Sequence, residues 1–447
     1  MAQLNRVRAT ARPFAASQHI GEIATPTAAN IPLLEHLFIG FALLMFTRAI
    51  VPVLRYDATT VFDPTAGDST LRYIYVSIFV VTMFLILSRL GPFIQMLTQD
   101  YTVIVLMLLP LISVLWSIDP NLSLRRSIAL LVTTVFGVYL ASRYSLEQLL
   151  TMLAWLLGIS MILSIAFAVL APEYGVMSGS QAGSWRGIYI HKNYLGRTMN
   201  LAFIVFALLA LSDRRHRLGY GSLALLSCVP LYFAQSAGAM VMLLVSAALI
   251  MLARIVQQSS TNVAPTFIVI ALLAGSGMAS AYADFSTVLG ILGKDETFTG
   301  RTELWQFLIQ FIRERPWLGF GYDGFWRGWN GPSADVWAEI RWQPPHAHNN
   351  LIDIWLSLGL VGVTLVGLNL LRGYRNAIRW SRAHSEYVYI FPILFLAYMV
   401  LASTVYEPTF LQQNNFLWII YVTVICILAR HPDEITYGLE HSTDEQS

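Results

Sequence analysis

The segment His346-Ala347-His348-Asn349 carries the residues best suited to acid–base chemistry, at the point where a long polar loop enters an apolar stretch. A neutral imidazole can accept a proton near pH 7 and so act as a general base. The amino-terminal end of the helix expected there offers unpaired N–H groups and a partial positive charge, which favour a phosphate group. We therefore predict His348 as a catalytic base, with His346 and Asn349 beside it in substrate binding.

Two other interpretations of this segment are open. Two histidines this close can ligate a metal ion, but a zinc site needs three or four ligands, and the nearest carboxylate, Asp353, stands several residues further on. Asn349 is also a residue type that caps helices, so the segment could serve only to start a helix. The prediction is for no metal and no cofactor.

A second group of polar residues, from Trp185 to Asn193, precedes another apolar stretch. Arg186, His191 and Lys192 would suit a diphosphate, because arginine offers a planar fork that matches phosphate oxygens. The alternative is an aromatic and basic anchor at the membrane interface. Arg301 begins a third group and faces either solvent or the same anion. We predict Arg186, Arg301, His191 and Lys192 as substrate-binding residues.

The run Gly319-Phe320-Gly321-Tyr322-Asp323-Gly324 matches the dinucleotide-binding pattern GxGxxG in form only. No strand precedes it, and that pattern needs a strand before it and a helix after it. Turn formation accounts for these glycines. Ionisable residues at membrane depth are functional candidates by default, and those identified here are Glu35, Asp353 and Glu407.

The composition places these groups on a membrane protein. Hydrophobic residues make up 56% of the 447 residues and charged residues 12%, whereas a soluble domain is about one-quarter charged. Apolar stretches near the 20 residues that a bilayer requires recur along the chain. The predicted fold class is all-α, a polytopic bundle of about twelve transmembrane helices with a large, partly helical periplasmic loop. The expected helices are 32–54, 71–88, 101–116, 127–141, 148–171, 193–212, 219–235, 237–254, 264–283, 349–371, 387–405 and 414–429.

Arginine and lysine in short loops set the orientation, since they gather on the cytoplasmic side. This rule predicts that the tails 1–30 and 431–447 and the loop around Arg372–Arg382 are cytoplasmic, and that 31–430 form one membrane domain. Residues 284–348 then form the large periplasmic loop. Arg125 and Arg126 depart from the rule, because they fall on the outer side.

The loop 284–348 is long and rich in aromatic residues, whereas disordered segments are poor in them. Apolar residues between Thr302 and Arg315 recur at helical spacing, and Pro316 follows. We expect a folded cap on the membrane surface with an amphipathic helix at 302–315. Its tryptophans are Trp305, Trp317, Trp326, Trp329, Trp337 and Trp342.

Taken together, these motifs resemble those of the O-antigen ligase and polysaccharide polymerase (Wzy-type) superfamily of bacterial inner membranes. Its pattern of His-Asn, nine residues and then Gly-x-x-Gly is met by His348, Asn349, Gly359 and Gly362. The segments Leu115–Pro120 and Trp185–Gly196 look most like the exopolysaccharide-production branch. The run Gln235-Ser236-Ala237-Gly238 departs from the Ser-Arg of many ligases.

The resemblance implies a metal-independent glycosyltransferase that moves glycan from an undecaprenyl-diphosphate carrier to a sugar hydroxyl of a lipid-linked repeat unit. In this role His348 would take the acceptor proton, while Arg186 and Arg301 would hold the diphosphate. Implied partners are the lipid-linked oligosaccharide, membrane lipid, a chain-length regulator and a flippase, without nucleic acid. Alternatives are an O-antigen ligase acting on lipid A core, and a flippase or transporter of lipid-linked oligosaccharide, although no internal repeat typical of transporters is visible.

Overall fold

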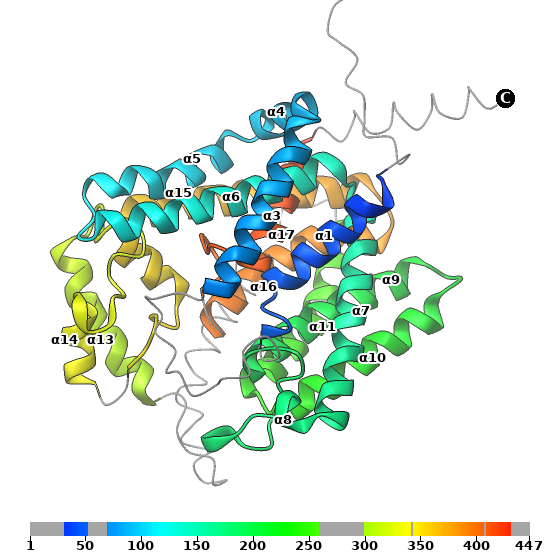
Figure 1. Cartoon of the computed structure of the whole chain (residues 1–447). Helices are drawn as coiled ribbons and strands as arrows, with labels where there is room; N and C mark the ends of the chain where they lie inside the picture. The colour runs from blue at the N-terminus through cyan, green and yellow to red at the C-terminus, as the bar shows by residue number, and fades with distance from the viewer. Residues whose placement is uncertain (1–30, 52–68, 259–298, 341–342, 406–407, 431–447) are drawn as a thin grey trace, which may run out of the picture.

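The computed structural model describes residues 31–51, 69–258, 299–340, 343–405 and 408–430 (Figure 1). Throughout these ranges the chain forms helices joined by turns. Extended pairing within them is limited to two isolated bridges, Ala49 with Tyr189 and Val176 with Trp185. The predicted all-α fold class is confirmed.

Seven helical segments of the described chain are long and apolar enough to cross a bilayer. A further pair, α4 (Leu90–Gln99) and α5 (Tyr101–Ile112), meets at a bend of 90° and adds an eighth span if the two count as one. The chain is therefore a multi-pass membrane protein, as predicted. The seven segments are α3 (Ser69–Leu87), α6 (Pro120–Arg143), α7 (Leu146–Leu170), α9 (Lys192–Ser212), α11 (Ala237–Gln258), α15 (Asn350–Ala383) and η4 (Tyr387–Ile390) with α16 (Phe391–Val405).

The predicted number of spans, about twelve, stays a prediction. Two apolar helices are shorter than a full span, α1 (Leu33–Phe46) and α17 (Phe416–Leu428). Another helix, α10 (Arg217–Phe233), corresponds to the predicted helix 219–235 and is shifted by two residues. The predicted helix 264–283 lies outside the described residues.

Several predicted boundaries were wrong. The helix expected at 32–54 ends at Phe46, and two other differences have reasons that are visible in the structure. The helix expected at 127–141 begins at Pro120, because Asp119 caps it by accepting a 3.0 Å hydrogen bond from the N–H of Leu122. The helix expected to end at 371 runs to Ala383. The arginines from Arg372 to Arg382 therefore lie on the last turns of α15 and not in a loop, since arginine is a good helix former.

Helix α17 lies at the centre of the bundle, and all thirteen of its residues are buried. It packs against α6, α15 and α16. Trp418 Nε1 donates to Thr134 Oγ1 (2.9 Å), and Thr423 Oγ1 donates to the carbonyl of Gly137 (3.0 Å). The backbones approach closely here, because a Cβ on Gly137 would lie 2.9 Å from the Ile419 carbonyl oxygen.

Residues 299–340 and 343–348, here called the cap, fold around an apolar core of their own. The amphipathic helix is confirmed as α13 (Thr299–Glu314) and ends before Pro316. The cap also holds η3 (Gly328–Asn330) and α14 (Ser333–Glu339), and it lies beside the ends of α5, α6 and α15 (Figure 1). Its core consists of Leu304, Leu308, Ile312, Phe320, Phe325, Val336, Ile340, Ala347 and, from α15, Leu356.

Helix α15 is broken at Gly359, whose φ of 65° and ψ of −165° are not helical. The break frees backbone groups that bind the cap: the N–H of Leu360 donates to the Pro316 carbonyl (2.8 Å), and the Leu356 carbonyl accepts from Phe320 (2.7 Å). The second glycine of the motif, Gly362, packs against Leu358 across the break. Gly359 is therefore the motif glycine at which the cap docks onto α15.

The orientation rule predicts that the cap and the α9–α10 loop lie on opposite sides of the membrane. In a background with Cys228→Ala and Cys426→Ala, a cysteine at exposed Asn330 should react with an impermeant maleimide in intact spheroplasts. A cysteine at exposed Arg214 should react only after permeabilisation. Reversed accessibility of the two positions would show that the predicted orientation is wrong.

Candidate active site

The loop before α15 holds His348 in a strained backbone conformation. Its φ is +52°, and such left-handed non-glycine residues cost about 1–3 kcal/mol. Trp305 Nε1 donates to the Ala347 carbonyl (2.8 Å), and the N–H of Ala347 donates to Asp353 Oδ1 (2.9 Å). The Asn349 side chain caps α15, accepting a hydrogen bond of 3.0 Å from its first turn. Capping is thus confirmed for Asn349, and it fixes the neighbouring His348.

Asp353 holds this loop from the first turn of α15. Its carboxylate is buried, and Oδ1 also accepts from Trp326 Nε1 at 2.8 Å, so one oxygen ties the loop to the cap. The other oxygen, Oδ2, has no hydrogen-bond partner within the described ranges. Asp353 is therefore a positioning residue for the segment that contains His348.

The two histidines lie against each other, with ring centroids 4.1 Å apart. His346 Nδ1 accepts a hydrogen bond of 3.1 Å from the backbone N–H of His348. Burial, together with the charges of Arg301 and Arg48, lowers the pKa of His346 to about 3. His346 is therefore neutral at pH 7 with its proton on Nε2, and it supports the loop instead of taking up protons.

Arg301 lies in the first turn of α13, close enough to His346 for its charge to act on that ring. Burial lowers the pKa of Arg301 to about 10, so the guanidinium stays charged at pH 7. The structure therefore brings the predicted Arg301, His346 and His348 together at the base of the cap.

Arg48, just after α1, contributes a cation that the sequence analysis missed. Arg48 Nη1 donates to the Tyr194 hydroxyl at 2.9 Å, and its guanidinium lies 5.6 Å from the centre of that ring. The guanidinium of Arg197, a buried residue of α9, lies 4.5 Å from the same ring. Ionisable residues at membrane depth are the signal for both arginines, but only Glu35, Asp353 and Glu407 were identified from the sequence by that signal.

The segment that follows Arg186 runs beside Arg48. The N–H of Ile50 donates to the Ile188 carbonyl at 2.7 Å, and Ala49 forms a bridge with Tyr189. The group before α9 therefore lies beside Arg48, and the charge of Arg48 also acts on His346 in the group before α15.

Arg186 and Lys192 form hydrogen bonds to backbone carbonyls of this region. Arg186 donates to the carbonyls of Tyr174 (2.7 Å) and Glu173 (3.3 Å) at α8 (Pro172–Gly175), and burial lowers its pKa. His191 Nδ1 caps α9, and Lys192 Nζ donates to the Gln235 carbonyl at 3.4 Å. A direct role of Arg186, His191 and Lys192 in diphosphate binding stays a prediction.

The GxGxxG-like run is a turn that docks on residues 116–118. Trp116 Nε1 donates to the Leu318 carbonyl (2.8 Å), and the N–H of Ile118 donates to the Phe320 carbonyl (3.2 Å). Gly321 has a φ of +88°, and a Cβ there would lie 2.4 Å from Ser117 Cβ. The turn interpretation is confirmed.

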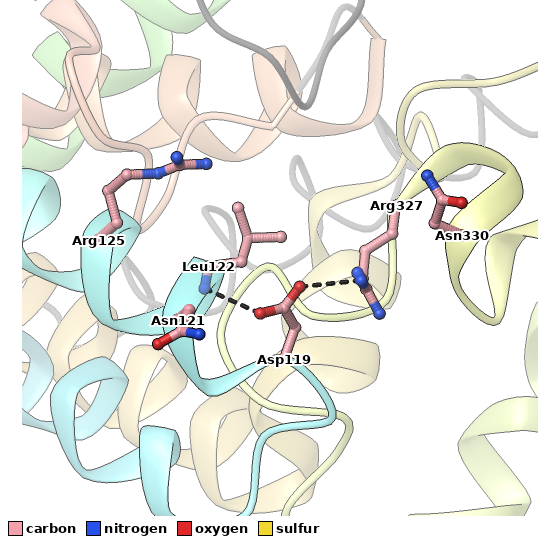
Figure 2. Close-up of a pocket in the computed structure, with 6 residues that line it drawn as sticks. All are labelled: Asp119, Asn121, Leu122, Arg125, Arg327 and Asn330. Atoms are coloured by element: carbon pink, nitrogen blue, oxygen red, sulfur yellow. Dashed lines mark hydrogen bonds and ion pairs between the residues drawn. The ribbon is translucent and has the colours of Figure 1, made fainter.

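Two ion pairs continue this junction, and one of them, between Asp119 and Arg327, borders a pocket of 390 Å³ (Figure 2). Arg327 of the cap pairs with Asp119 (3.0 Å), and Arg126 of α6 pairs with Asp323 (3.3 Å). The pocket is lined by Asp119, Asn121, Leu122, Arg125, Arg327 and Asn330.

Metal ligation was the alternative interpretation of the two histidines. In the described ranges no three His, Cys, Asp or Glu side chains gather closely enough to hold a metal ion. The carboxylate nearest in sequence, Asp353, binds Ala347 and Trp326 instead.

Residues 221–367 match the family described as O-antigen ligase, a stretch that includes the cap, His348 and both motif glycines. The exopolysaccharide production protein ExoQ of Rhizobium meliloti (strain 1021) is 27% identical over 281 residues, which cover 60% of this chain. The match spans 63% of that relative's length. Both findings confirm the resemblance predicted from the motifs: the chain is similar to the O-antigen ligase family and to an exopolysaccharide production protein.

Proposed function

We propose that this protein is a polysaccharide polymerase of the bacterial inner membrane, active in exopolysaccharide biosynthesis. It transfers glycan from an undecaprenyl-diphosphate carrier to a sugar hydroxyl of a lipid-linked repeat unit, on the periplasmic side. The observation that carries this proposal is the convergence of a strained His348, a neutral His346 and the cations Arg301 and Arg48 where the cap meets the membrane helices.

The proposed reaction is a single displacement. The acceptor hydroxyl oxygen forms a bond to the anomeric carbon of the donor, while the bond from that carbon to the diphosphate oxygen breaks. The electron pair leaves with undecaprenyl diphosphate, and the hydroxyl proton passes to the imidazole of His348. Because a diphosphate is a good leaving group, no strong general acid is required.

Arg301 and Arg48 are suited to stabilise the charge that develops on the diphosphate. A preorganised cationic site acts most strongly where water is excluded. Burial lowers the pKa of Arg301 to about 10, so the residue is desolvated and still charged. Arg48 is fixed through the hydroxyl of Tyr194 and needs little rearrangement to meet an anion.

The loop geometry favours a base held in one position. Asp353, Trp305 and the Asn349 cap restrain the backbone on both sides of His348. Misplacing a catalytic group by about 1 Å can cost about a hundredfold in rate, so such restraint has a direct catalytic value.

The proposed function is tested with purified protein in proteoliposomes that contain synthetic undecaprenyl-diphosphate repeat units. A polymerase produces a ladder of glycans and releases undecaprenyl diphosphate. A ligase, which the match to the O-antigen ligase family also supports, transfers only when lipid A core is supplied. Movement of intact lipid-linked donor across the bilayer, without a new glycosidic bond, would contradict the enzyme assignment.

Arg301 provides a prediction about the phosphate site. We expect Arg301→Ala to lower the transfer rate by about 10²–10³, the usual cost of removing one charge-stabilising donor. Arg301→Lys should retain part of the activity, because lysine keeps the charge but lacks the planar fork. Exposed Arg313 on the same helix is the matched control, and Arg313→Ala should be unchanged. Full activity of Arg301→Ala at a normal protein level would remove this residue from the site.

A further inference from the structure

The pocket between α6 and the cap is a second site that the proposed transfer reaction does not use. Figure 2 shows Asn121 and Arg125 on the α6 side, Arg327 and Asn330 on the cap side, and the Asp119–Arg327 ion pair between them. Its volume of 390 Å³ lies within the range of about 300–1,000 Å³ typical of small-molecule sites.

The lining has unused hydrogen-bonding capacity. Asn121, Arg125 and Asn330 are exposed, and within the described ranges their side chains make no hydrogen bond or ion pair. Two arginines and one aspartate line the pocket, so the lining carries one net positive charge. Since Asp119 is paired with Arg327 at 3.0 Å, the remaining charge is that of Arg125.

These groups favour a sugar over a lipid. Five of the six lining residues are polar or charged, and the apolar one, Leu122, is only 8% exposed. A lipid headgroup would bring acyl chains that need an apolar surface. Trp329, next to Asn330 in sequence, is 59% exposed, and its ring centroid lies 5.5 Å from that of Trp337 in an edge-to-face contact. Its exposed indole ring is amphipathic, with an apolar face and a polar N–H group.

The pocket is also connected to the candidate active site. Arg327 lines it, and the adjacent Trp326 donates to Asp353, whose same oxygen holds Ala347 next to His348. The pocket and the loop that contains His348 are therefore joined through the hydrogen bond between Trp326 and Asp353.

We propose that the pocket formed by Asn121, Arg125, Arg327 and Asn330 binds a carboxylate-bearing segment of the glycan away from the bond that is made. The amides bind sugar hydroxyls, and Arg125 binds the carboxylate. This inference rests on the proposed function and deepens it, because it names an acidic oligosaccharide as the substrate class.

The test measures binding by the full-length protein in nanodiscs without charged lipid. The probes are carrier-free, uronic-acid-containing oligosaccharides obtained by partial hydrolysis of the polysaccharide that the source cells make, and the same fragments after carboxyl reduction. The double variant Arg125→Ala, Asn330→Ala should bind the acidic fragments at least about tenfold more weakly, as expected for the loss of a charge-assisted hydrogen bond. The carboxyl-reduced fragments should lose a similar factor on the unaltered protein, and the variant should make shorter polymer.

Exposed Arg214→Ala is the control and should bind like the unaltered protein. Thermal unfolding of the double variant should also be unchanged, because neither replaced side chain has a hydrogen-bond or ion-pair partner among the described residues. Binding of the acidic fragments by the double variant with unchanged affinity would overturn the proposal. Loss of fragment binding by the unaltered protein when phosphatidylglycerol is added to the nanodiscs would also overturn it and would identify a lipid site. Binding needs no transfer, so pocket-dependent binding without any transferase activity would refute the proposed function alone. Transfer with pocket-independent binding would refute the pocket alone.

Discussion

Replacing His348 with alanine should abolish polymer formation while the protein still accumulates in the membrane and still binds lipid-linked donor. Loss of one general base costs about 10²–10⁴ in rate, enough to remove visible high-molecular-weight polysaccharide. Cells should then retain single repeat units on the carrier lipid. The measurement is a reconstituted assay with undecaprenyl-diphosphate repeat units, together with gel analysis of cellular polysaccharide.

His346→Ala is the matched comparison. His346 accepts the backbone N–H of His348 and is neutral at pH 7, so its loss should loosen the loop and lower the rate less. A metal site would make both histidines equally important and would let a chelator stop the purified enzyme. An unchanged polymerisation rate for the His348→Ala variant would show that His348 is not the general base. Failure of that variant to bind donor would identify a purely structural role.

The second large effect is expected from Gly359→Ala, which should prevent the protein from reaching its folded state. The φ and ψ at Gly359, 65° and −165°, fall in a region that is essentially restricted to glycine. The added Cβ would also lie 2.1 Å from the carbonyl carbon of Trp317, where the cap crosses α15. The conformation alone costs about 1–3 kcal/mol, a large part of a typical stability of about 5–15 kcal/mol.

The measurement is the amount of protein in membranes and its thermal unfolding in detergent. Gly367→Ala is the control on the same helix, because a Cβ there has nothing within 4 Å and alanine is the better helix former. We expect Gly367→Ala to match or exceed the unaltered protein in stability. A Gly359→Ala protein with normal abundance and an unchanged unfolding temperature would contradict the role given to this break.

Local patterns accounted for much of the fold. Apolar runs located the helices, because each needs only its own composition to signal a span. The spacing from Thr302 to Arg315 and the following proline predicted α13 for the same reason. Asn349 likewise caps α15 through a contact two residues away.

Features that depend on distant partners could not be read in the same way. Gly359 was placed in the motif pattern from the sequence, but the break at this residue was not predicted, because its special conformation depends on residues 316–318, which cross α15 there. Arg48 stands far from His346 in sequence, and no spacing rule brings their charges together. Arg186 was predicted to bind phosphate, but its guanidinium donates to the backbone carbonyls of Glu173 and Tyr174. Backbone acceptors of this kind cannot be recognised from the types and spacing of side chains.

The complete burial of α17 constrains how the protein is made. Residues 416–428 are synthesised after every helix that they contact, yet they lie between α6, α15 and α16. Those earlier helices enter the membrane without their final neighbours and must leave a space that α17 later fills. Assembly of this bundle is therefore completed only when α17 takes its place among helices that were inserted before it. At thirteen residues, α17 is shorter than the roughly 20 that span a bilayer, so its stable placement depends on the protein surface that receives it more than on lipid.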